Sequence, residues 1–194
     1  VAFRFKHVGW DFKKQLFKDL FLLVISIGVA IFFIKTGFAD KFVVSLDGLK
    51  WLGIIFAGLF FTSIFTSAPS IVLLGVFSQN TPLLVVAILG GLGAVIGDYI
   101  IFSFVKSRIS KNLELMLASS PNSRMSLIFK KELFKFFLPF LGAIIIASPL
   151  PDEIGVIMLG VSKMSKKRFI LLTFILNSLG IFFIAWMAKT IIGF

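Results

Sequence analysis

Long apolar runs alternate with short polar or basic segments along the whole chain. A membrane-spanning helix needs roughly 20 mostly apolar residues. The runs at residues 20–35, 82–105 and 168–192 are close to this length, so each predicts one span. The runs at residues 49–78 and 136–162 are too long for one comfortable span and too short for two. The pattern therefore predicts an all-α polytopic membrane protein with a single transmembrane domain.

The two longer runs each contain a helix-breaking segment near the middle. The breaking residues are Ser67, Pro69 and Ser70 in the first run, and Ser148, Pro149 and Pro151 in the second. Proline lacks the backbone N–H that a helix interior requires, and its ring clashes with the preceding turn. Each run therefore either crosses the membrane once with a kink, or enters and returns on one side as a re-entrant hairpin.

Basic residues decide between these topologies, because cytoplasmic loops of membrane proteins carry an excess of Lys and Arg. With two hairpins and a cytoplasmic N-terminus, 16 of the 20 basic residues lie on the cytoplasmic side. The other four are Lys35, Lys41, Lys50 and Lys189. With two kinked spans, the better orientation places only 11 inside and nine outside. The charge pattern therefore favours two re-entrant hairpins.

The hairpin topology gives the two halves of the chain opposite orientations. Each hairpin is followed by one span; the first hairpin enters from outside and the second from the cytoplasm. Such an inverted repeat places its site near the membrane midplane, where the two hairpin tips meet. The tripeptide Leu-Gly-Val follows both breaks, at residues 74–76 and 159–161, and agrees with this repeat.

Two basic segments flank the predicted membrane elements. Residues 1–18 combine Lys side chains with apolar residues at helical spacing, among them Val8, Phe12 and Leu16, and predict an interfacial helix. Residues 106–135 contain seven Lys and Arg residues and a Ser-Pro break. They predict a cytoplasmic linker of two amphipathic helices.

Composition agrees with a membrane protein and narrows the functional classes. Hydrophobic residues make up 58% of the chain, 26 of the 194 residues are Phe, and the mean hydropathy is +1.05. These values exclude an ordinary soluble domain. The net charge of +11 could suggest nucleic-acid binding, but the basic residues lie in blocks between apolar runs, which indicates anionic lipid headgroups instead. The absence of Cys excludes disulfides and thiolate metal sites.

Ionisable residues inside the apolar runs are the main candidate site residues. A charged side chain at membrane depth costs about 2.5–3.5 kcal/mol on insertion scales, so it indicates a functional site by default. Asp152 and Glu153 stand together at the second break, and Asp98 lies within a predicted span. Each is a candidate proton or cation site, and Asn177 in the last span is a further polar candidate. For Asp98, a position at the cytoplasmic end of its span is the alternative.

The breaks also predict two half-helix N-termini at the midplane. Pro69 and Pro151 suit first helical turns, with Ser67 or Ser148 as caps. The unsatisfied N–H groups of such a terminus favour a negative charge, so the adjacent acids could serve only to stabilise it. Glu153 is the stronger coupling candidate, because its longer side chain can reach across to the first tip. The predicted substrate or ion site comprises Glu153, Asp152, Asp98, Ser67, Ser70, Ser148 and Asn177.

Five short segments together show Pro breaks, a Gly-Asp step and a basic turn. They are Thr66-Ser67-Ala68-Pro69-Ser70, Gly97-Asp98-Tyr99, Pro149-Leu150-Pro151, Met164-Ser165-Lys166-Lys167-Arg168-Phe169, and Asn177 with Gly180. This pattern resembles the DedA family, also called the VTT or SNARE-associated membrane domain. The resemblance implies paired re-entrant hairpins and a role in moving lipids, such as polyprenyl phosphates or phospholipids, often linked to the proton gradient. We expect an integral protein of a prokaryotic plasma membrane, with its N-terminus in the cytoplasm.

Two departures from that family bear on the substrate. The family's first hairpin usually carries a Glu after its Pro, where this chain has Ser70 and Ile71. Its second hairpin usually carries Arg residues around the Pro, where this chain has Asp152 and Glu153. Of the family's usual site residues, only Asp98 is retained by position.

These features lead to one main hypothesis and two alternatives. We expect a transporter or flippase of a lipid or small amphiphile, coupled to a proton or cation through midplane carboxylates. An exporter of small cationic compounds would also suit two carboxylates, and an energy-independent scramblase would use the hairpins only to thin the bilayer. We expect no enzyme activity, cofactor or metal, because the sequence shows no catalytic triad, metal cluster or phosphate loop. Membrane lipids and a proton or cation are the expected partners. The sequence leaves open whether the protein forms a homo-oligomer.

Overall fold

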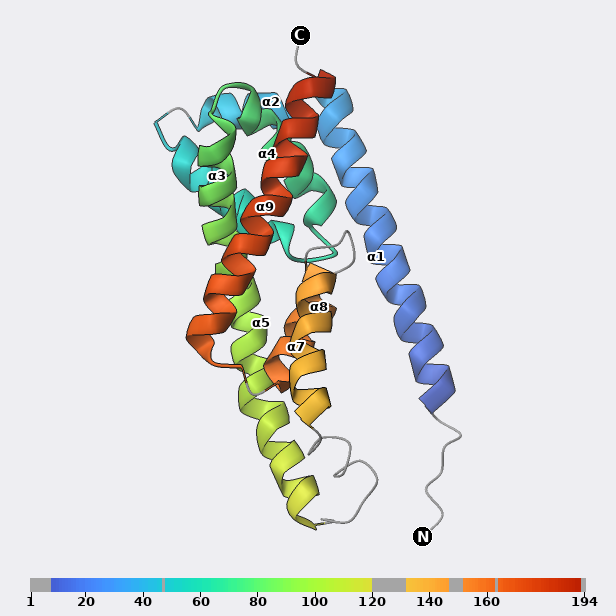
Figure 1. Ribbon diagram of the computed structural model, residues 1–194. Helices are drawn as coiled ribbons and strands as arrows, with labels where there is room; N and C mark the ends of the chain where they lie inside the picture. The colour runs from blue at the N-terminus through green and yellow to red at the C-terminus, as the bar shows by residue number, and fades with distance from the viewer. Residues whose placement is uncertain (1–7, 47, 120–131, 147–151, 163, 193–194) are drawn as a thin grey trace.

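In the computed structural model, residues 8–46, 48–119, 132–146, 152–162 and 164–192 are described, and these ranges form helices and turns without a strand. The helices are α1 (Val8–Thr36), α2 (Phe38–Ser45), α3 (Lys50–Phe61), α4 (Ser67–Gln79), α5 (Leu83–Ser119), α7 (Glu132–Ile146), α8 (Asp152–Val161) and α9 (Lys166–Ile192). They form an elongated bundle, with the long helices α5 and α9 running through it (Figure 1). The prediction of an all-helical protein is confirmed for these residues.

Two of the helices contain segments long and apolar enough to cross a membrane, Leu83–Lys106 of α5 and Lys166–Ile191 of α9. Helices α1 and α2 pass the same test only together, and they meet at a bend of 77°. Gly37 stands at this bend with φ +62°, a left-handed conformation that glycine adopts without a Cβ clash. Two or three spanning helices fit an integral membrane protein, as the sequence predicts.

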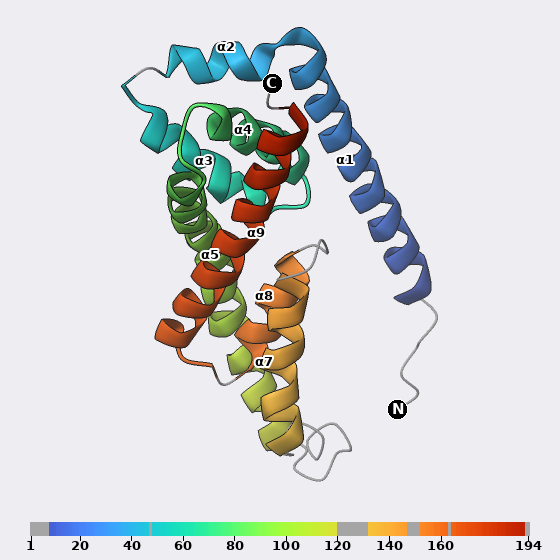
Figure 2. The same cartoon turned by 45° about the horizontal axis from the view of Figure 1, so that its top comes forward.

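The N-terminal part is more helical than the apolar pattern suggests. Helix α1 runs without interruption from Val8, within the predicted interfacial helix, into the predicted first span, and no Pro stands in its sequence. The segment between the first span and the first predicted hairpin forms α2, which buries Ala39 and Val43. Figure 2 shows α2 lying across one end of the bundle. The segment that the sequence predicts as a polar connection is therefore a short amphipathic helix.

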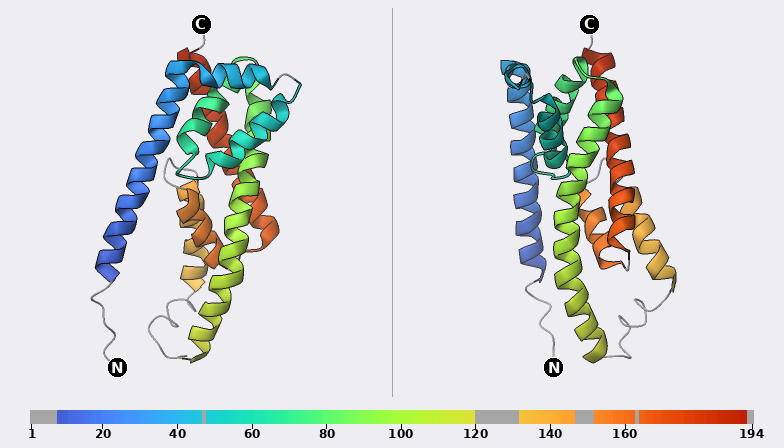
Figure 3. Two further views of the ribbon diagram at one scale, coloured as in Figure 1. Left: turned by 180° about the vertical axis from the view of Figure 1, so that it is seen from behind. Right: turned by 90° about the vertical axis from the view of Figure 1, so that its left-hand side faces the viewer.

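Helices α3 and α4 pack against each other, and so do α7 and α8. The turn between α3 and α4, residues 62–66, lies at mid-height of the bundle, and so do the end of α7 and the start of α8 (Figure 1). The views from behind and from the side show that the two pairs extend toward opposite ends of the molecule (Figure 3). Pro69 lies in the first turn of α4, where a helix makes no use of the missing N–H.

Each of these helix pairs also contacts the long helix that follows the other pair. Helix α4 packs on α9, and α8 packs on α5. A Cβ built on Gly75 of α4 would lie 3.1 Å from the Ala188 Cβ, and one built on Gly160 of α8 would lie 2.7 Å from Val105 Cγ1. Both glycines belong to the repeated Leu-Gly-Val, and the leucine before each is fully buried. Each copy of the tripeptide therefore forms a close helix contact.

Helices α3 and α5 approach each other almost backbone to backbone. A Cβ built on Gly93 would lie 1.9 Å from the Ile55 carbonyl oxygen, and one built on Gly58 would lie 2.0 Å from the Gly90 carbonyl oxygen. Small residues are enriched at helix contacts in membranes because they permit this approach, which increases van der Waals packing where lipid removes the usual hydrophobic driving force. The glycine-rich sequence of α5 is thus explained by its neighbour.

We expect Gly93→Ala to destabilise the protein, because the added methyl group would collide with backbone atoms of α3 that cannot rotate away. Overpacking of this kind typically costs about 1–3 kcal/mol. Thermal unfolding in detergent, followed by circular dichroism, would measure the effect. The matched control is Gly28→Ala on α1, where nothing lies within 4 Å of the added carbon. Equal unfolding midpoints for the two variants would contradict the close contact.

Candidate functional site

A buried hydrogen bond joins the two long helices. Asn177 Nδ2 on α9 donates to Asp98 Oδ2 on α5 at 2.7 Å, and neither side chain is more than 1% exposed. Asp98 lies eight residues from Lys106, and Asn177 lies eleven residues from Lys166, at the matching ends of the two candidate spans. At a rise of 1.5 Å per residue, the pair lies about 12–17 Å from these ends, which is about half the thickness of a hydrocarbon core of about 30 Å.

The pair lies on a seam in which every fourth residue of both helices is buried. On α5 the seam residues are Val86, Gly90, Ala94, Asp98 and Phe102, and on α9 they are Phe169, Thr173, Asn177, Ile181 and Ala185. Residues four apart share one face of a helix, so these two faces are the ones that meet. The Thr173 hydroxyl donates to the Phe169 carbonyl oxygen at 3.0 Å, within its own helix. Asp98 and Asn177 therefore form a polar link across a seam whose other residues, apart from Thr173, are apolar.

Apolar side chains close off the pair on both sides. One turn toward the α2 end, Ala94 and Ile181 belong to a buried cluster shared by α2, α3, α4, α5 and α9. One to two turns toward the other end, the Phe102 and Phe169 rings stack with their centres 3.9 Å apart. Polar groups in such surroundings are costly unless they are hydrogen-bonded. The bond between the pair therefore has a larger energetic effect than it would have in water.

The Asn177 amide suits a carboxyl group that changes its protonation state. Its N–H can donate to a carboxylate and to the carbonyl oxygen of a neutral acid, so the bond persists in both states. The Asn177 Oδ1 atom has no hydrogen-bond partner within the described part of the chain, and it could accept the proton of a neutral Asp98 after a small rotation. The Asn177 amide can therefore hydrogen-bond to either protonation state of the Asp98 carboxyl group.

Thr62 brings the start of the α3–α4 turn against α5, one residue before Asp98. Thr62 closes α3, is 3% exposed, and donates to the Leu59 carbonyl oxygen at 3.3 Å. A Cβ built on Gly97, the residue before Asp98, would lie 2.7 Å from the Thr62 hydroxyl oxygen. The turn between α3 and α4 thus begins against the α5 backbone at Gly97, the residue that precedes Asp98.

The predicted serines of the first break bond to backbone carbonyl groups. Ser67 donates to the Ile64 carbonyl oxygen at 3.4 Å, and Ser70 donates to that of Thr66 at 2.8 Å. The N-cap of α4 is Thr66, which forms no side-chain cap hydrogen bond, and Ser67 lies inside the helix. The capping role predicted for Ser67 is therefore wrong. These hydroxyl groups satisfy carbonyl groups around the turn instead.

The predicted residues of the second break lie at the start of α8 or just before it. Asp152 is the first residue of α8 and Glu153 is the second, and this end of the helix lies at mid-height of the bundle in Figure 1. Ser148, Pro149 and Pro151 fall outside the described residues. The depth of the two acids in a bilayer and the roles of their side chains stay predictions.

Three hydroxyl groups near the pair were not predicted. They belong to Thr62, Thr173 and Ser178, and a Cβ built on Gly91 would lie 2.0 Å from the Ser178 Oγ. Thr173 stands four residues before Asn177, so helical spacing alone could have identified it. Thr62 could not be found in this way, because its position depends on the contact between α3 and α5.

No family model, no curated protein and no solved structure matches this chain. Among the described residues, no three His, Cys, Asp or Glu side chains lie close enough together to hold a metal ion. The structure defines an all-helical protein with two or three helices that could span a membrane, and a buried Asp–Asn pair between two of them.

We expect a double-mutant cycle on Asp98→Ala and Asn177→Ala to show coupling, because either change alone already removes the shared hydrogen bond. Interhelical hydrogen bonds in a membrane protein average about 0.6 kcal/mol and reach about 1.7 kcal/mol, so a coupling free energy in this range is expected. Unfolding in mixed detergent micelles would measure it. Replacing Asn177→Ala by Thr190→Ala, at an exposed position of α9, gives the control cycle. Strict additivity of the first pair would contradict the bond's role in stability.

Proposed function

We propose that this chain is a DedA-like integral membrane protein that moves a lipid or small amphiphile across the bilayer, driven by a proton or cation gradient. The observation that carries the proposal is the Asp98–Asn177 bond, which buries a carboxyl group between two candidate spanning helices. A carboxyl group at this depth is expensive, and hydroxyl or amide pairs would join the helices at lower cost. We therefore assign Asp98 a titrating role in addition to its structural one.

The arrangement of the two helix pairs supports this class of protein. We infer that α3–α4 and α7–α8 are re-entrant hairpins that enter from opposite membrane faces. Each contacts the long helix that follows the other, through one copy of the Leu-Gly-Val tripeptide. Inverted repeats of this kind hold their site near the midplane, at the repeat interface. The Asp98–Asn177 bond joins the helices that follow the two hairpins, which is that interface.

The contacts of Lys106 support a cytoplasmic assignment for one end of the bundle. Its ammonium group donates to the Met164 carbonyl oxygen in the turn before α9, and lies 5.1 Å from the centre of the Phe102 ring. The exposed basic residues 166–168 follow directly. The start of α1 and the end of α5 lie at this same end in Figure 1. The excess of Lys and Arg there supports a cytoplasmic position for it, together with the N-terminus.

A transport cycle follows from the chemistry of the pair. Ionised Asp98 accepts the Asn177 N–H bond in a seam that excludes water, which disfavours movement of the charge through the apolar clusters. Protonation removes that charge and lets the α5–α9 seam and the adjacent α3–α4 turn rearrange at lower cost. Access to the site would then pass from one membrane face to the other, with the substrate headgroup moving between the hairpin tips and release of the proton completing the cycle.

Export of small cationic compounds is a second candidate, and the acids at the start of α8 favour it. Asp152 and Glu153 occupy the first turn of that helix. Two adjacent carboxylates would attract a cation more readily than a phosphate. An uncoupled scramblase would need neither these acids nor Asp98. The identity of the moved species and its dependence on a gradient therefore separate the three functions.

We expect single cysteines at Ser110 and Ser165 to react with a membrane-impermeant thiol reagent from the same face of the membrane. The Lys106–Met164 contact joins the two segments that carry these positions. A cysteine at Ser45, at the exposed C-terminal end of α2, should react from the opposite face. Labelling of intact cells and of inside-out vesicles would measure this. Reaction of Ser110 and Ser165 from opposite faces would contradict the hairpin topology.

We expect Asp98→Asn to fold normally and to lose all dependence of transport on an imposed pH difference, because an amide cannot titrate. The measurement is the initial transport rate of a fluorescent phospholipid in proteoliposomes against that pH difference. Glu153→Gln is the parallel test of the second acid, and Asp40→Asn, at an exposed position of α2, is the matched control. Unchanged gradient dependence in Asp98→Asn would remove this residue from the mechanism. Equal rates of phospholipid movement between the leaflets in all variants, without a gradient, would identify a scramblase.

A further inference from the structure

A small pocket lies at the end of the bundle that carries α2, away from the Asp98–Asn177 pair. Its volume is about 140 Å³, and the residues that line it are Val43, Val44, Lys50, Phe77, Asn80 and Thr81. These residues come from α2, from the first residue of α3, from the last part of α4, and from the turn that leads into α5. Four segments of the chain thus meet around one site.

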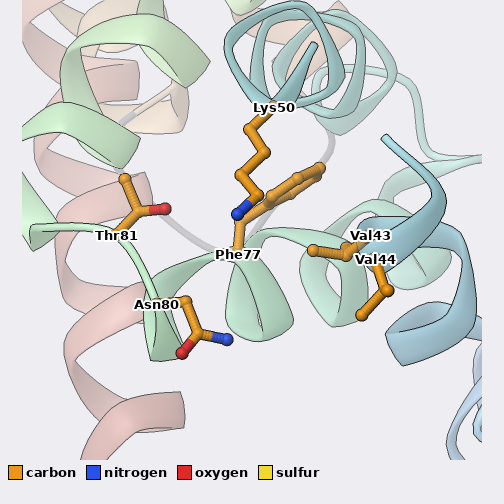
Figure 4. Close-up of a pocket in the computed structure, with 6 residues that line it drawn as sticks. All are labelled: Val43, Val44, Lys50, Phe77, Asn80 and Thr81. Atoms are coloured by element: carbon orange, nitrogen blue, oxygen red, sulfur yellow. The ribbon is translucent and has the colours of Figure 1, made fainter. Parts of the chain in front are cut away.

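The groups that line the pocket suit an anion with an apolar attachment. Figure 4 shows the Lys50 ammonium group and the Thr81 hydroxyl group pointing toward each other across the pocket, with the Phe77 ring beside the lysine. The Asn80 amide lies at the rim and points away from Lys50 (Figure 4). An ammonium group and a hydroxyl group are donors that a phosphate oxygen accepts. An engineered cavity of about 150 Å³ binds benzene, so a headgroup phosphate would fit in this pocket and a whole lipid would not.

The pocket lies where the headgroups of the outer leaflet would lie. Thr81 precedes the first residue of the α5 span by only two positions, and Lys50 is followed by Trp51, which is 58% exposed. Tryptophan at such a position is typical of the membrane–water interface. Val44, on the pocket wall, is 72% exposed and continues the apolar lining out to the bundle surface. An acyl chain attached to a bound phosphate would have an apolar path from the pocket into the bilayer.

We propose that this pocket binds the headgroup phosphate of an anionic phospholipid. Lys50 and Thr81 contact the phosphate oxygens, Phe77 and Val43 form the apolar floor, and the glycerol and acyl chains leave past Val44. The site would hold a lipid at the membrane face opposite the basic end of the bundle. This goes beyond the proposed function, because it concerns binding at equilibrium and requires no transport and no titrating group.

Trp51 provides a direct readout of this binding. In a background in which Trp10 and Trp186 are replaced by Phe, Trp51 is the only tryptophan, since the chain has three. The protein is reconstituted in bilayers that mix brominated phosphatidylglycerol with unlabelled phosphatidylcholine, and then with the bromine label on the other lipid. Quenching of Trp51 in the two mixtures gives the preference for the anionic headgroup. The unsubstituted pocket is expected to prefer phosphatidylglycerol.

A lysine near the bilayer surface contributes about 1 kcal/mol to the attraction of an anionic lipid, so Lys50→Gln is expected to lower the preference about fivefold. Lys41→Gln, which removes an exposed charge from α2 outside the pocket, is the matched control; it loses only the general attraction of a surface charge and should lower the preference less than Lys50→Gln. Thr81→Val should weaken it while keeping the charge. Equal loss in Lys41→Gln, or no loss in either pocket variant, would overturn the proposal.

Competition with inorganic phosphate tests which group the pocket recognises. Loss of the preference for phosphatidylglycerol when inorganic phosphate is added would support a phosphate site, whereas phosphate binding without any lipid preference would overturn the assignment to lipid.

Discussion

The seam between α5 and α9 is the contact on which the rest of the structure depends. Helices α3 and α8 pack on α5, and helices α4 and α7 pack on α9, so every helix except α1 and α2 is placed through this seam. Lipid tails are as apolar as the side chains, so apolar burial alone does not fix how two helices align in a membrane. The Asp98–Asn177 bond does, because any other alignment of α9 on α5 would separate the buried carboxyl group from the Asn177 N–H. The polar pair thereby sets the register of the bundle.

The apolar runs and the proline breaks were sufficient to predict most of the membrane helices, because both depend on local sequence. The spans of α5 and α9 follow from run length, and the start of α4 follows from Pro69 in its first turn. Helix α2 was not predicted, because its polar residues obscured an amphipathic pattern that only the bundle contact makes stable. Gly37 permits the sharp bend, but glycine alone does not indicate which way the chain turns.

The candidate site could be predicted one residue at a time but not as a pair. Asp98 and Asn177 were each identified as polar groups inside apolar spans, which is a property of the sequence. Their hydrogen bond depends on which faces of α5 and α9 meet, and the seam repeats every four residues in both helices without indicating how they align. The place of Thr62 depends in turn on the glycine contact between α3 and α5. Which side chains meet across two helices depends on the tertiary packing, and the lengths and spacings of apolar runs carry little information about it.

The two helix pairs contact α5 in different ways: α3 through backbone atoms at glycines, and α8 through side chains. Backbone atoms of these helices touch at Gly58 and Gly93, so the first pair cannot slide on α5 without breaking a fit that has no side chains to rearrange. Helix α7 touches α9 only sparsely, and α8 reaches α5 where Gly160 meets the side chain of Val105. Side-chain contacts can pivot where backbone contacts cannot. The second pair therefore meets α5 through a contact that side-chain rotation can adjust, whereas the first pair meets it through a backbone contact that cannot adjust in this way.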